Sequence, residues 1–253
     1  LLVAKKETVV VDIGGTTTDV GYLSQGFPRE SGVAVDVGGV RTNFRMPDIL
    51  AIGLGGGSRV RGVAELQVGP DSVGFELTHK AMVFGGDTLT ATDIAVASGA
   101  ADIGDAANVS GLDTDLVKRA MDKLHQMVED AIDRMKTSAT DVPVILVGGG
   151  SVLINRDLKG VSEMHVPEHS GVANAIGAAI AQIGGEVDRV FSYDADGREN
   201  SIDKAKSEAR ARAIEAGANA DTVEIIEVDE IPLAYMPGGS VRLRVKAVGD
   251  LAA

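Results

Sequence analysis

The stretch TVVVDIGGTTTDVGYL, residues 8–23, carries the strongest architectural signal in the chain. Residues 8–13 form a short run rich in valine, which is typical of a buried strand, and strand character resumes over residues 19–23. The glycines and threonines between the two runs are poor helix formers. The stretch therefore predicts a β-hairpin. It argues against a Rossmann dinucleotide site, in which a helix follows the first glycines.

The turn of this hairpin offers groups that could bind a phosphate: Asp12, Gly14, Gly15, Thr16, Thr17 and Asp19. Exposed amides and hydroxyls without bulky side chains can wrap a phosphate with N–H groups. An adjacent carboxylate can hold Mg²⁺ through water or orient an attacking water. The same spacing fits a tight hairpin whose aspartates accept hydrogen bonds from turn amides, and both interpretations stay open.

A second glycine stretch follows a strand pattern much later in the chain. Residues 143–147, PVILV, predict a buried strand that leads directly into Gly148, Gly149, Gly150 and Ser151. A run of glycines can bring the backbone against a flat ligand, such as a purine with its ribose. An ordinary crossover loop of an α/β fold gives the same pattern, so this stretch alone does not identify a ligand.

The rest of the chain predicts one lobe and a smaller tail. Residues 113–138 repeat apolar side chains at steps of three and four, which predicts a long amphipathic helix. Residues 60–68 alternate like a surface strand, and residues 172–183 predict a small-residue helix packed closely on both sides. The pattern of residues 187–253 predicts a strand, a charged helix and two further strands. We therefore expect an α/β lobe over residues 1–186 and a small α+β subdomain over residues 187–253.

Composition excludes several classes of function. The 253 residues carry 24 Lys and Arg against 37 Asp and Glu, a net charge of −13, so neither a nucleic acid nor an anionic membrane is an expected partner. No apolar run reaches the roughly 18–20 residues of a membrane span. The absence of cysteine excludes disulfides and thiolate metal sites and fits a cytoplasmic location. No compact His-x-x-x-His spacing indicates a structural zinc site.

The two glycine stretches, with helical material between them, resemble those of the actin, sugar-kinase and heat-shock-chaperone ATPase superfamily. There the first is the second phosphate loop and the later one is the adenosine loop. The resemblance implies an actin-like, ribonuclease H-like lobe with a mixed sheet and helices. It also implies that Asp12 and the residues through Thr17 face the phosphates and Mg²⁺ of ATP, with Asp12 as metal ligand, and that Gly148–Ser151 face the nucleoside.

Several segments resemble the A-type protein of the hydantoinase/oxoprolinase family. They are DIGGTTTDVG (12–21), GGVRTNFRMP (38–47), IGLGGGS (52–58), VGPDSV (68–73), FGGDTLTATD (84–93), VGGGSV (147–152) and PEHSGVANAIG (167–177). The resemblance implies an enzyme that uses ATP and Mg²⁺ to activate a small cyclic amide by phosphoryl transfer before ring opening. Asp12 and Asp19 would be its catalytic residues. A B-type hydantoinase subunit would be its partner, and assembly as a homo-oligomer stays open.

Members of this family carry an N-terminal lobe with its own first phosphate loop, whereas this sequence has a single such motif and starts with Leu1. We therefore expect a C-terminal portion of a larger protein, incomplete for catalysis without the missing N-terminal lobe. Three alternatives stay open: an ATP-dependent ketone carboxylase subunit, a non-enzymatic nucleotide-gated binding module, and a nucleotide-free assembly lobe whose glycine loops only turn corners.

Two further groups of polar residues have both a functional and a structural interpretation. Residues 53–58, GLGGGS, form either another anion or substrate loop or a packing turn. Arg41, Asn43 and Arg45 would share one strand face and could bind a carboxylate, although surface ion pairs are commoner.

The FGGDTLTATD segment and the histidines complete the candidates. Thr90 or Thr88 is expected to cap the helix that follows, with a site role for Asp87, Thr90, Thr92 and Asp93 as the alternative. His169 is the best functional candidate among the histidines because it precedes the small-residue helix. His125 is expected on the solvated edge of the long helix.

Overall fold

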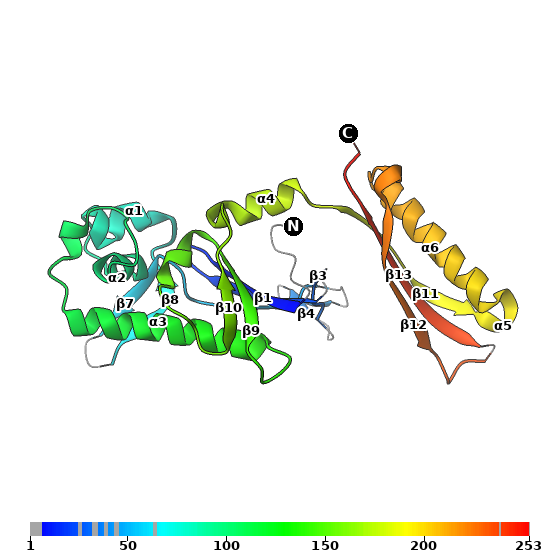
Figure 1. Cartoon of the computed structure of the whole chain (residues 1–253), viewed down its shortest axis with the longest axis horizontal. Coiled ribbons are helices and arrows are strands. Elements are labelled where there is room, and N and C mark those ends of the chain that lie inside the picture. The colour runs from blue at the N-terminus through cyan, green and yellow to red at the C-terminus, as the bar shows by residue number, and fades with distance from the viewer. Residues whose placement is uncertain are drawn as a thin grey trace. The chain divides into compact units, whose positions relative to one another are not determined.

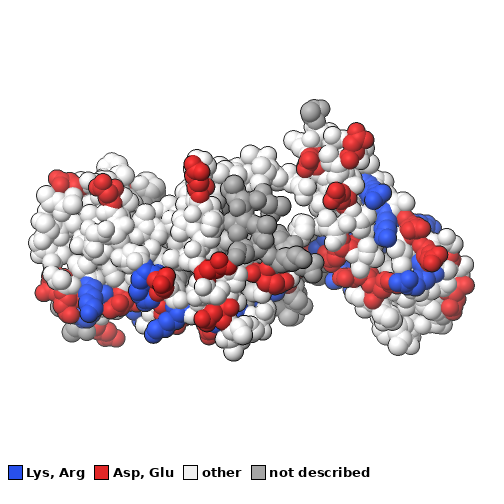
Figure 2. All heavy atoms as spheres, viewed as in Figure 1, with Lys and Arg blue, Asp and Glu red and all other residues white. Residues whose placement is uncertain are grey.

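The computed structural model describes residues 7–24, 27–31, 35–37, 40–42, 46–62, 65–237 and 239–252. The chain forms two compact units, Leu1–Ala173 and Asn174–Ala253 (Figure 1). Among the described residues, no helix combines the length and apolarity needed to cross a bilayer. On the face drawn in Figure 2, basic side chains are interspersed with acidic ones, so the described residues there offer no broad basic surface.

The first unit is built on a mixed sheet. β1 (Glu7–Ile13) and β2 (Thr18–Ser24) form the predicted hairpin, in continuous antiparallel register from Glu7↔Ser24 to Ile13↔Thr18. β9 (Val142–Val147) lies parallel to β1, and β10 (Val161–His165) lies parallel to β9. The strand order is β10-β9-β1-β2-β3, with β3 at Phe27–Pro28, and β6 (Ile49–Ile52) also pairs with β2. Parallel and antiparallel neighbours in one sheet give the mixed architecture that the resemblance implied.

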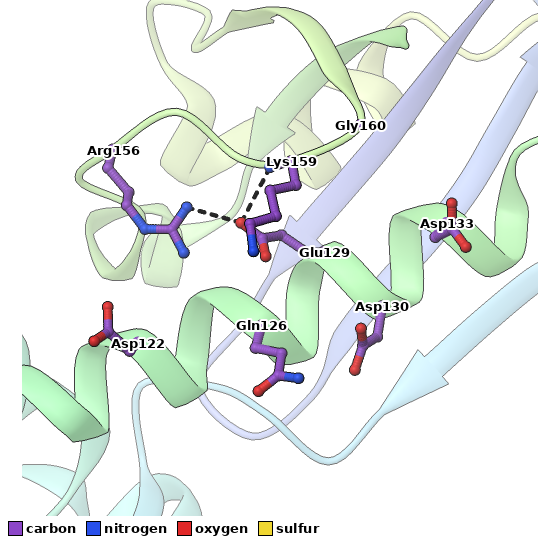
Figure 3. Close-up of a pocket in the computed structure, with 8 residues that line it drawn as sticks. All are labelled: Asp122, Gln126, Glu129, Asp130, Asp133, Arg156, Lys159 and Gly160. Carbon is purple, nitrogen blue, oxygen red and sulfur yellow. Dashed lines mark hydrogen bonds and ion pairs between the residues drawn. The ribbon is translucent and has the colours of Figure 1, made fainter. Parts of the chain in front are cut away.

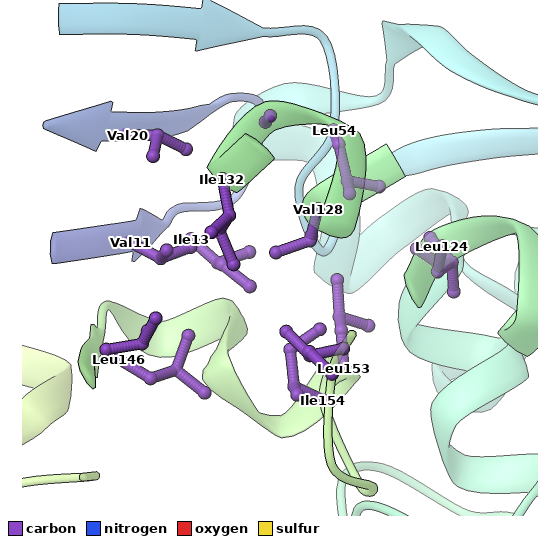
Figure 4. Close-up of a cluster of buried hydrophobic side chains, with 14 of the residues drawn as sticks. Val11, Ile13, Val20, Leu54, Leu124, Val128, Ile132, Leu146, Leu153 and Ile154 are labelled. Carbon is purple, nitrogen blue, oxygen red and sulfur yellow. The ribbon is translucent and has the colours of Figure 1, made fainter. Parts of the chain in front are cut away.

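One long helix covers one face of this sheet. α3 runs from Thr114 to Met135, and its N-terminus is capped by Asp113, whose side chain accepts the Leu116 amide at 2.8 Å. The apolar stripe of α3 buries Leu124, Val128 and Ile132 in one cluster with side chains of β1 and β2 (Figure 4). Truncating one such buried side chain to alanine typically costs about 2–5 kcal/mol, so this stripe fixes the helix on the sheet.

The prediction of one strand over residues 60–68 is wrong. The structure has a hairpin there, β7 (Ser58–Arg61) and β8 (Gln67–Ser72), in which Val60 pairs with Val68. The alternation of apolar and polar residues resembles that of one strand because Val60 and Val68, on the two strands, both lie on the buried face of the hairpin. A second short hairpin joins β4 (Val35–Val37) to β5 (Val40–Thr42).

Short helices fill the segment between β8 and α3. They are η1 (Gly74–Glu76), α1 (Leu77–Lys80), η2 (Met82–Phe84), α2 (Ala91–Ala97) and η3 (Ala106–Val109). Thr90 caps α2, as predicted, in a reciprocal arrangement with Asp93. Asp93 is fully buried and also accepts the Val83 amide at 2.7 Å, so its role is to fix this segment.

The predicted small-residue helix is shorter than expected and is not packed on both sides. α4 spans Ala173–Ala179 and buries none of its residues, and Val172 and Ile180 at its ends are 54% and 60% exposed. Small apolar residues without a period do not specify a buried face, which explains the error.

The second unit has the predicted β-α-β-β order. Its strands β11 (Ile183–Ser192), β12 (Glu224–Pro232) and β13 (Ser240–Gly249) form an antiparallel sheet in the order β11-β13-β12. α6 (Arg198–Glu215) lays a narrow alanine face, Ala205, Ala209 and Ala213, on this sheet. A side chain at Gly185 would overlap the backbone of α6 at Ala209 and Ala213, so glycine permits the close approach. The unit also contains two short helices, α5 (Tyr193–Asp196) and η6 (Ala220–Thr222), and all of α4 after Ala173.

Tyr193 in this unit is expected to titrate at unusually high pH. Burial, together with the hydrogen bond that its Oη donates to Glu230 at 2.7 Å, raises the pKa of Tyr193 to about 12. Because the folded value lies above the ordinary value of about 10, the contribution to stability is complete below pH 10 and is lost between pH 10 and about 12. Ultraviolet titration of tyrosinate, as a difference between wild type and Tyr193→Phe, measures this pKa. Glu230→Gln should lower it towards 10, and an unchanged value in that variant would contradict the assignment.

Candidate functional site

The hairpin turn places two carboxylates side by side at the end of β1. Asp12 and Asp19 are directly opposite in the β1–β2 register, so their side chains leave the sheet on the same face. Asp12 is half-buried and Asp19 is exposed. The turn is closed by the Gly14 amide, which donates to the carbonyl of Thr17 at 2.9 Å. The two predicted catalytic residues therefore lie together at one corner of the sheet.

The turn also presents three consecutive backbone amides that are free to bind a ligand. Among the described residues, the N–H groups of Gly15, Thr16 and Thr17 have no hydrogen-bond partner, and all three residues are exposed. Backbone polar groups are usually paired with another protein group or with solvent. A row of amides at a turn is the arrangement that binds anions such as phosphate.

The Gly53–Ser58 segment packs beneath this turn. The amides of Gly56 and Gly57 donate to the carbonyls of Gly14 and Gly15 at 3.0 and 2.7 Å. A Cβ on Gly55 would lie 2.5 Å from the Thr16 nitrogen. These two amides are therefore already used, and residues Leu54–Ser58 are buried. The contacts favour the packing interpretation of this segment over a second anion loop.

The second glycine stretch meets the same corner from β9. Gly148 has φ 88° and ψ 156°, which is essentially restricted to glycine, and a Cβ there would overlap the Ile13 carbonyl and Asp12 Oδ1. A Cβ on Gly150 would lie 2.8 Å from the Gly14 carbonyl oxygen. The two motifs, more than a hundred positions apart in sequence, are thus in contact.

Each motif presents one glycine to open space. Nothing lies within 4 Å of a Cβ built on Gly15 or on Gly149. Gly149 begins the short helix η4 (Gly149–Leu153), in which Ser151 is half-buried and donates its amide to Gly148 at 3.1 Å. The corner therefore has an accessible surface made of glycine backbone on both sides.

The donor set at this corner suits magnesium better than a metal held by protein alone. Among the described residues, no group of three or more His, Asp or Glu side chains could hold a metal ion. Mg²⁺ commonly binds to one or two carboxylates and completes its shell with water and substrate phosphates. Asp12 and Asp19 beside free amides fit that pattern.

The remaining candidates are not brought into this corner as ligands. Asn43 and Arg45 lie outside the described residues, as does the Arg41 side chain. Asp87 is exposed and accepts a hydrogen bond from its neighbour Thr88, while Thr92 donates to the Gly56 carbonyl at 2.9 Å. The side chain of His169 is 65% exposed, although the next carbonyl, of Ser170, accepts the Gly148 amide at 2.9 Å.

A hollow exists elsewhere on the first unit. A groove of about 510 Å³ runs along α3, lined by Asp122, Glu129, Arg156 and their neighbours (Figure 3). None of the residues predicted to bind a ligand lines it. The candidate site is therefore the glycine corner, formed by residues 12–19 and 148–151. Its assignment rests on the chemistry of these residues rather than on a deep cavity.

Comparison with known proteins agrees with the resemblance seen in the sequence. Residues 2–140 match the family described as hydantoinase/oxoprolinase. The chain belongs to the hydantoinase/oxoprolinase family. No curated protein matches it in sequence.

Two solved structures share the fold of this hydantoinase/oxoprolinase chain. One is acetone carboxylase in a nucleotide-free state, with TM-score 0.63, 17% identity, and 98% of this chain covered. The other is the ATP-dependent caprolactamase from Pseudomonas jessenii, with TM-score 0.65, 14% identity and 97% of this chain covered. The predicted α/β fold class with a mixed sheet is confirmed. The chain spans about half the length of these proteins, 47% and 46%.

Proposed function

We propose that this chain is the ATP-binding lobe of an ATP-dependent enzyme, and that Mg-ATP binds at the glycine corner. The observation that carries the proposal is the row of free amides at Gly15, Thr16 and Thr17 beside two carboxylates. Free amides suit an oxyanion, and carboxylates suit the cation that accompanies a triphosphate. The open glycine surface at Gly149 suits the flat nucleoside.

Each part of the corner has a defined task in this proposal. The Gly14–Thr17 amides and hydroxyls hold the phosphates, and the Gly148–Ser151 backbone holds the nucleoside. Asp12 holds the magnesium-bound water or orients the nucleophile, with Asp19 beside it. Positioning and charge stabilisation supply most of the acceleration in phosphoryl transfer, so rigid backbone corners are appropriate to the task.

The reaction we propose is activation of a small cyclic amide. The γ-phosphoryl group of ATP passes to the amide oxygen and ADP leaves. Water attacks the activated ring carbon, and the ring C–N bond breaks as the amine nitrogen takes up a proton. A second water then hydrolyses the resulting acyl phosphate to a carboxylate and inorganic phosphate. The likeness to caprolactamase supports this choice. The likeness to acetone carboxylase supports the alternative, ATP-dependent carboxylation of a ketone. Product analysis distinguishes an opened ring from a carboxylated ketone.

The proposal includes partners for this lobe. The relatives are about twice as long as this chain, which supports a further lobe that closes over the nucleotide from the other side. A B-type hydantoinase subunit is the proposed partner for the substrate half of the reaction.

Gly15→Ala tests the nucleotide site. A methyl group at this position meets nothing in the fold, so the variant should be as stable as wild type. It would stand directly among the phosphate-binding amides and should weaken Mg-ATP binding by about tenfold or more, the loss of roughly one charge-assisted hydrogen bond. Isothermal titration calorimetry measures the affinity, in this chain and in a longer protein that contains it.

Gly111→Ala is the matched control for this test. Gly111 also faces open space, but it lies between η3 and α3 and belongs to neither glycine stretch. Its variant should bind Mg-ATP as wild type does. Equal affinities of wild type and Gly15→Ala would reject the phosphate-binding role of the turn.

A further inference from the structure

His125 lies inside the protein, contrary to the expectation that it faces solvent. It is 2% exposed on α3, and its Nε2 lies 3.1 Å from the carbonyl oxygen of Leu153. A carbonyl only accepts hydrogen bonds, so Nε2 is the donor. The buried Nδ1 has no partner among the described residues, which makes the neutral imidazole with its proton on Nε2 the form that fits.

Glu129, one turn further along α3, holds the same segment at a second point. It is 8% exposed, and its Oε1 accepts from Arg156 Nη1 at 2.7 Å and from the Lys159 amide at 3.1 Å (Figure 3). Residues four apart on a helix lie on one face. His125 and Glu129 therefore bind consecutive parts of the segment that follows the second glycine stretch, at Leu153 and at Arg156–Lys159.

The charges around these two residues favour this protonation pattern. Burial lowers the pKa of His125, and Arg156 lowers it further, while Asp122 and Glu129 act in the opposite direction. Burial alone would raise the pKa of Glu129, but the Lys159 amide and Arg156 together hold it below its usual value. Both residues thus keep the charge state that their contacts need at neutral pH.

We propose that His125 and Glu129 are positioning residues for the Gly148–Leu153 loop, and that His125 sets the affinity of this loop for the nucleoside. Leu153 is the last residue of that loop, so the bond from His125 fixes its far end. Its near end is fixed by the Gly148 amide on Ser170 and by Gly150 against Gly14. The loop is held at both ends, and Gly149 is its most exposed residue. The positioning follows from these contacts, whereas its effect on affinity rests on the proposed function.

A purely space-filling role does not explain the histidine. An apolar side chain of similar size would fill the same position without leaving a buried ring nitrogen unpaired, which is unfavourable. The hydrogen bond to a loop carbonyl is what an apolar residue would lack. The buried Leu153 side chain anchors this end of the loop in the core, and the bond from His125 fixes its carbonyl in addition.

Two substitutions of His125 separate the effect of the hydrogen-bond donor from the effect of side-chain volume. In His125→Gln the amide nitrogen can reach the position of Nε2 and donate to Leu153, whereas His125→Leu fills space without a donor. Gln126→Ala is the control, since Gln126 is the exposed neighbour on α3. The measurements are hydrogen exchange of the amides in residues 147–154 and the Mg-ATP dissociation constant.

We expect His125→Leu to exchange at least about tenfold faster in residues 147–154 and to bind Mg-ATP about tenfold more weakly. His125→Gln and Gln126→Ala should keep wild-type values in both measurements. Recovery of wild-type values in His125→Gln but not in His125→Leu is a difference that a general packing defect would not produce.

The outcomes distinguish this inference from the proposed function. Wild-type exchange in the loop of His125→Leu would overturn the positioning role. Faster exchange with unchanged Mg-ATP affinity would overturn its link to the nucleoside. If the loop exchanges faster in His125→Leu but wild type itself binds no nucleotide, the positioning role is upheld and the proposed function is rejected. If His125→Leu does not fold, Arg156→Met tests the same segment by removing the ion pair with Glu129. Unchanged amide exchange in residues 147–154 of that variant would count against the positioning role of Glu129.

Discussion

Asp12→Asn is expected to lower ATP turnover by about 10²- to 10⁴-fold while leaving the fold intact. Asparagine keeps the shape of the side chain beside Gly148 but removes the negative charge, and with it the ability to hold a magnesium-bound water or to orient the nucleophile. Phosphate release by a longer protein that contains this chain measures turnover. Thermal unfolding of the chain shows whether stability is preserved.

Two further variants show whether the effect belongs to Asp12. Asp102→Asn removes a carboxylate from an exposed loop of the same unit and should leave turnover unchanged. Asp19→Asn removes the cross-strand neighbour and should lower turnover less than Asp12→Asn, because Asp19 is the more exposed of the pair. Wild-type turnover in Asp12→Asn would reject the role assigned to this residue.

The hairpin and the glycine stretches could be predicted because their signals are local. A valine run ending at Asp12 predicts a strand, and consecutive glycines predict a turn, whatever the rest of the chain does. The pairing of β1 with β9 could not be predicted in this way, since nothing local to Val9 specifies Val144 as its neighbour. The contact of Gly150 with Gly14 follows from that long-range pairing.

The buried position of His125 could have been predicted from the sequence. It lies between Met121, Leu124 and Val128, all buried on α3, so helical periodicity alone puts it on the covered face. The polarity of the imidazole favours the solvated edge of the helix, whereas its place in the apolar stripe favours the core, and the place in the stripe decides. A polar residue inside an apolar stripe indicates a partner on the opposite side, here the Leu153 carbonyl.

Residues 53–58 show the opposite situation. The sequence allowed a ligand loop or a packing turn, and composition could not choose between them because both need small residues. The choice depends on which amides remain free. Those of Gly56 and Gly57 are bonded to Gly14 and Gly15, while those of Gly15–Thr17 are not. Only the three-dimensional arrangement contains that difference.

Gly148→Ala is expected to destabilise the first unit by about 3–5 kcal/mol, a large share of the about 5–15 kcal/mol that holds a typical domain together. Two effects add in this variant. The φ and ψ of Gly148 are unfavourable for any residue with a Cβ, and the added carbon would overlap the Ile13 carbonyl and Asp12 Oδ1. Relief would require β1 and β9 to separate where Asp12 pairs with Val147. Chemical denaturation of the isolated chain measures the loss.

Gly149→Ala is the matched control, one residue along the same loop. Its Cβ would face open space and its φ is not in the left-handed region, so its free energy of unfolding should stay within about 1 kcal/mol of wild type. Equal stability of the two variants would mean that Gly148 is not in close contact with Asp12 and Ile13 at the end of β1. If Gly149→Ala folds normally and yet loses Mg-ATP affinity, the open side of the loop contacts the nucleotide, because the packed side is unchanged.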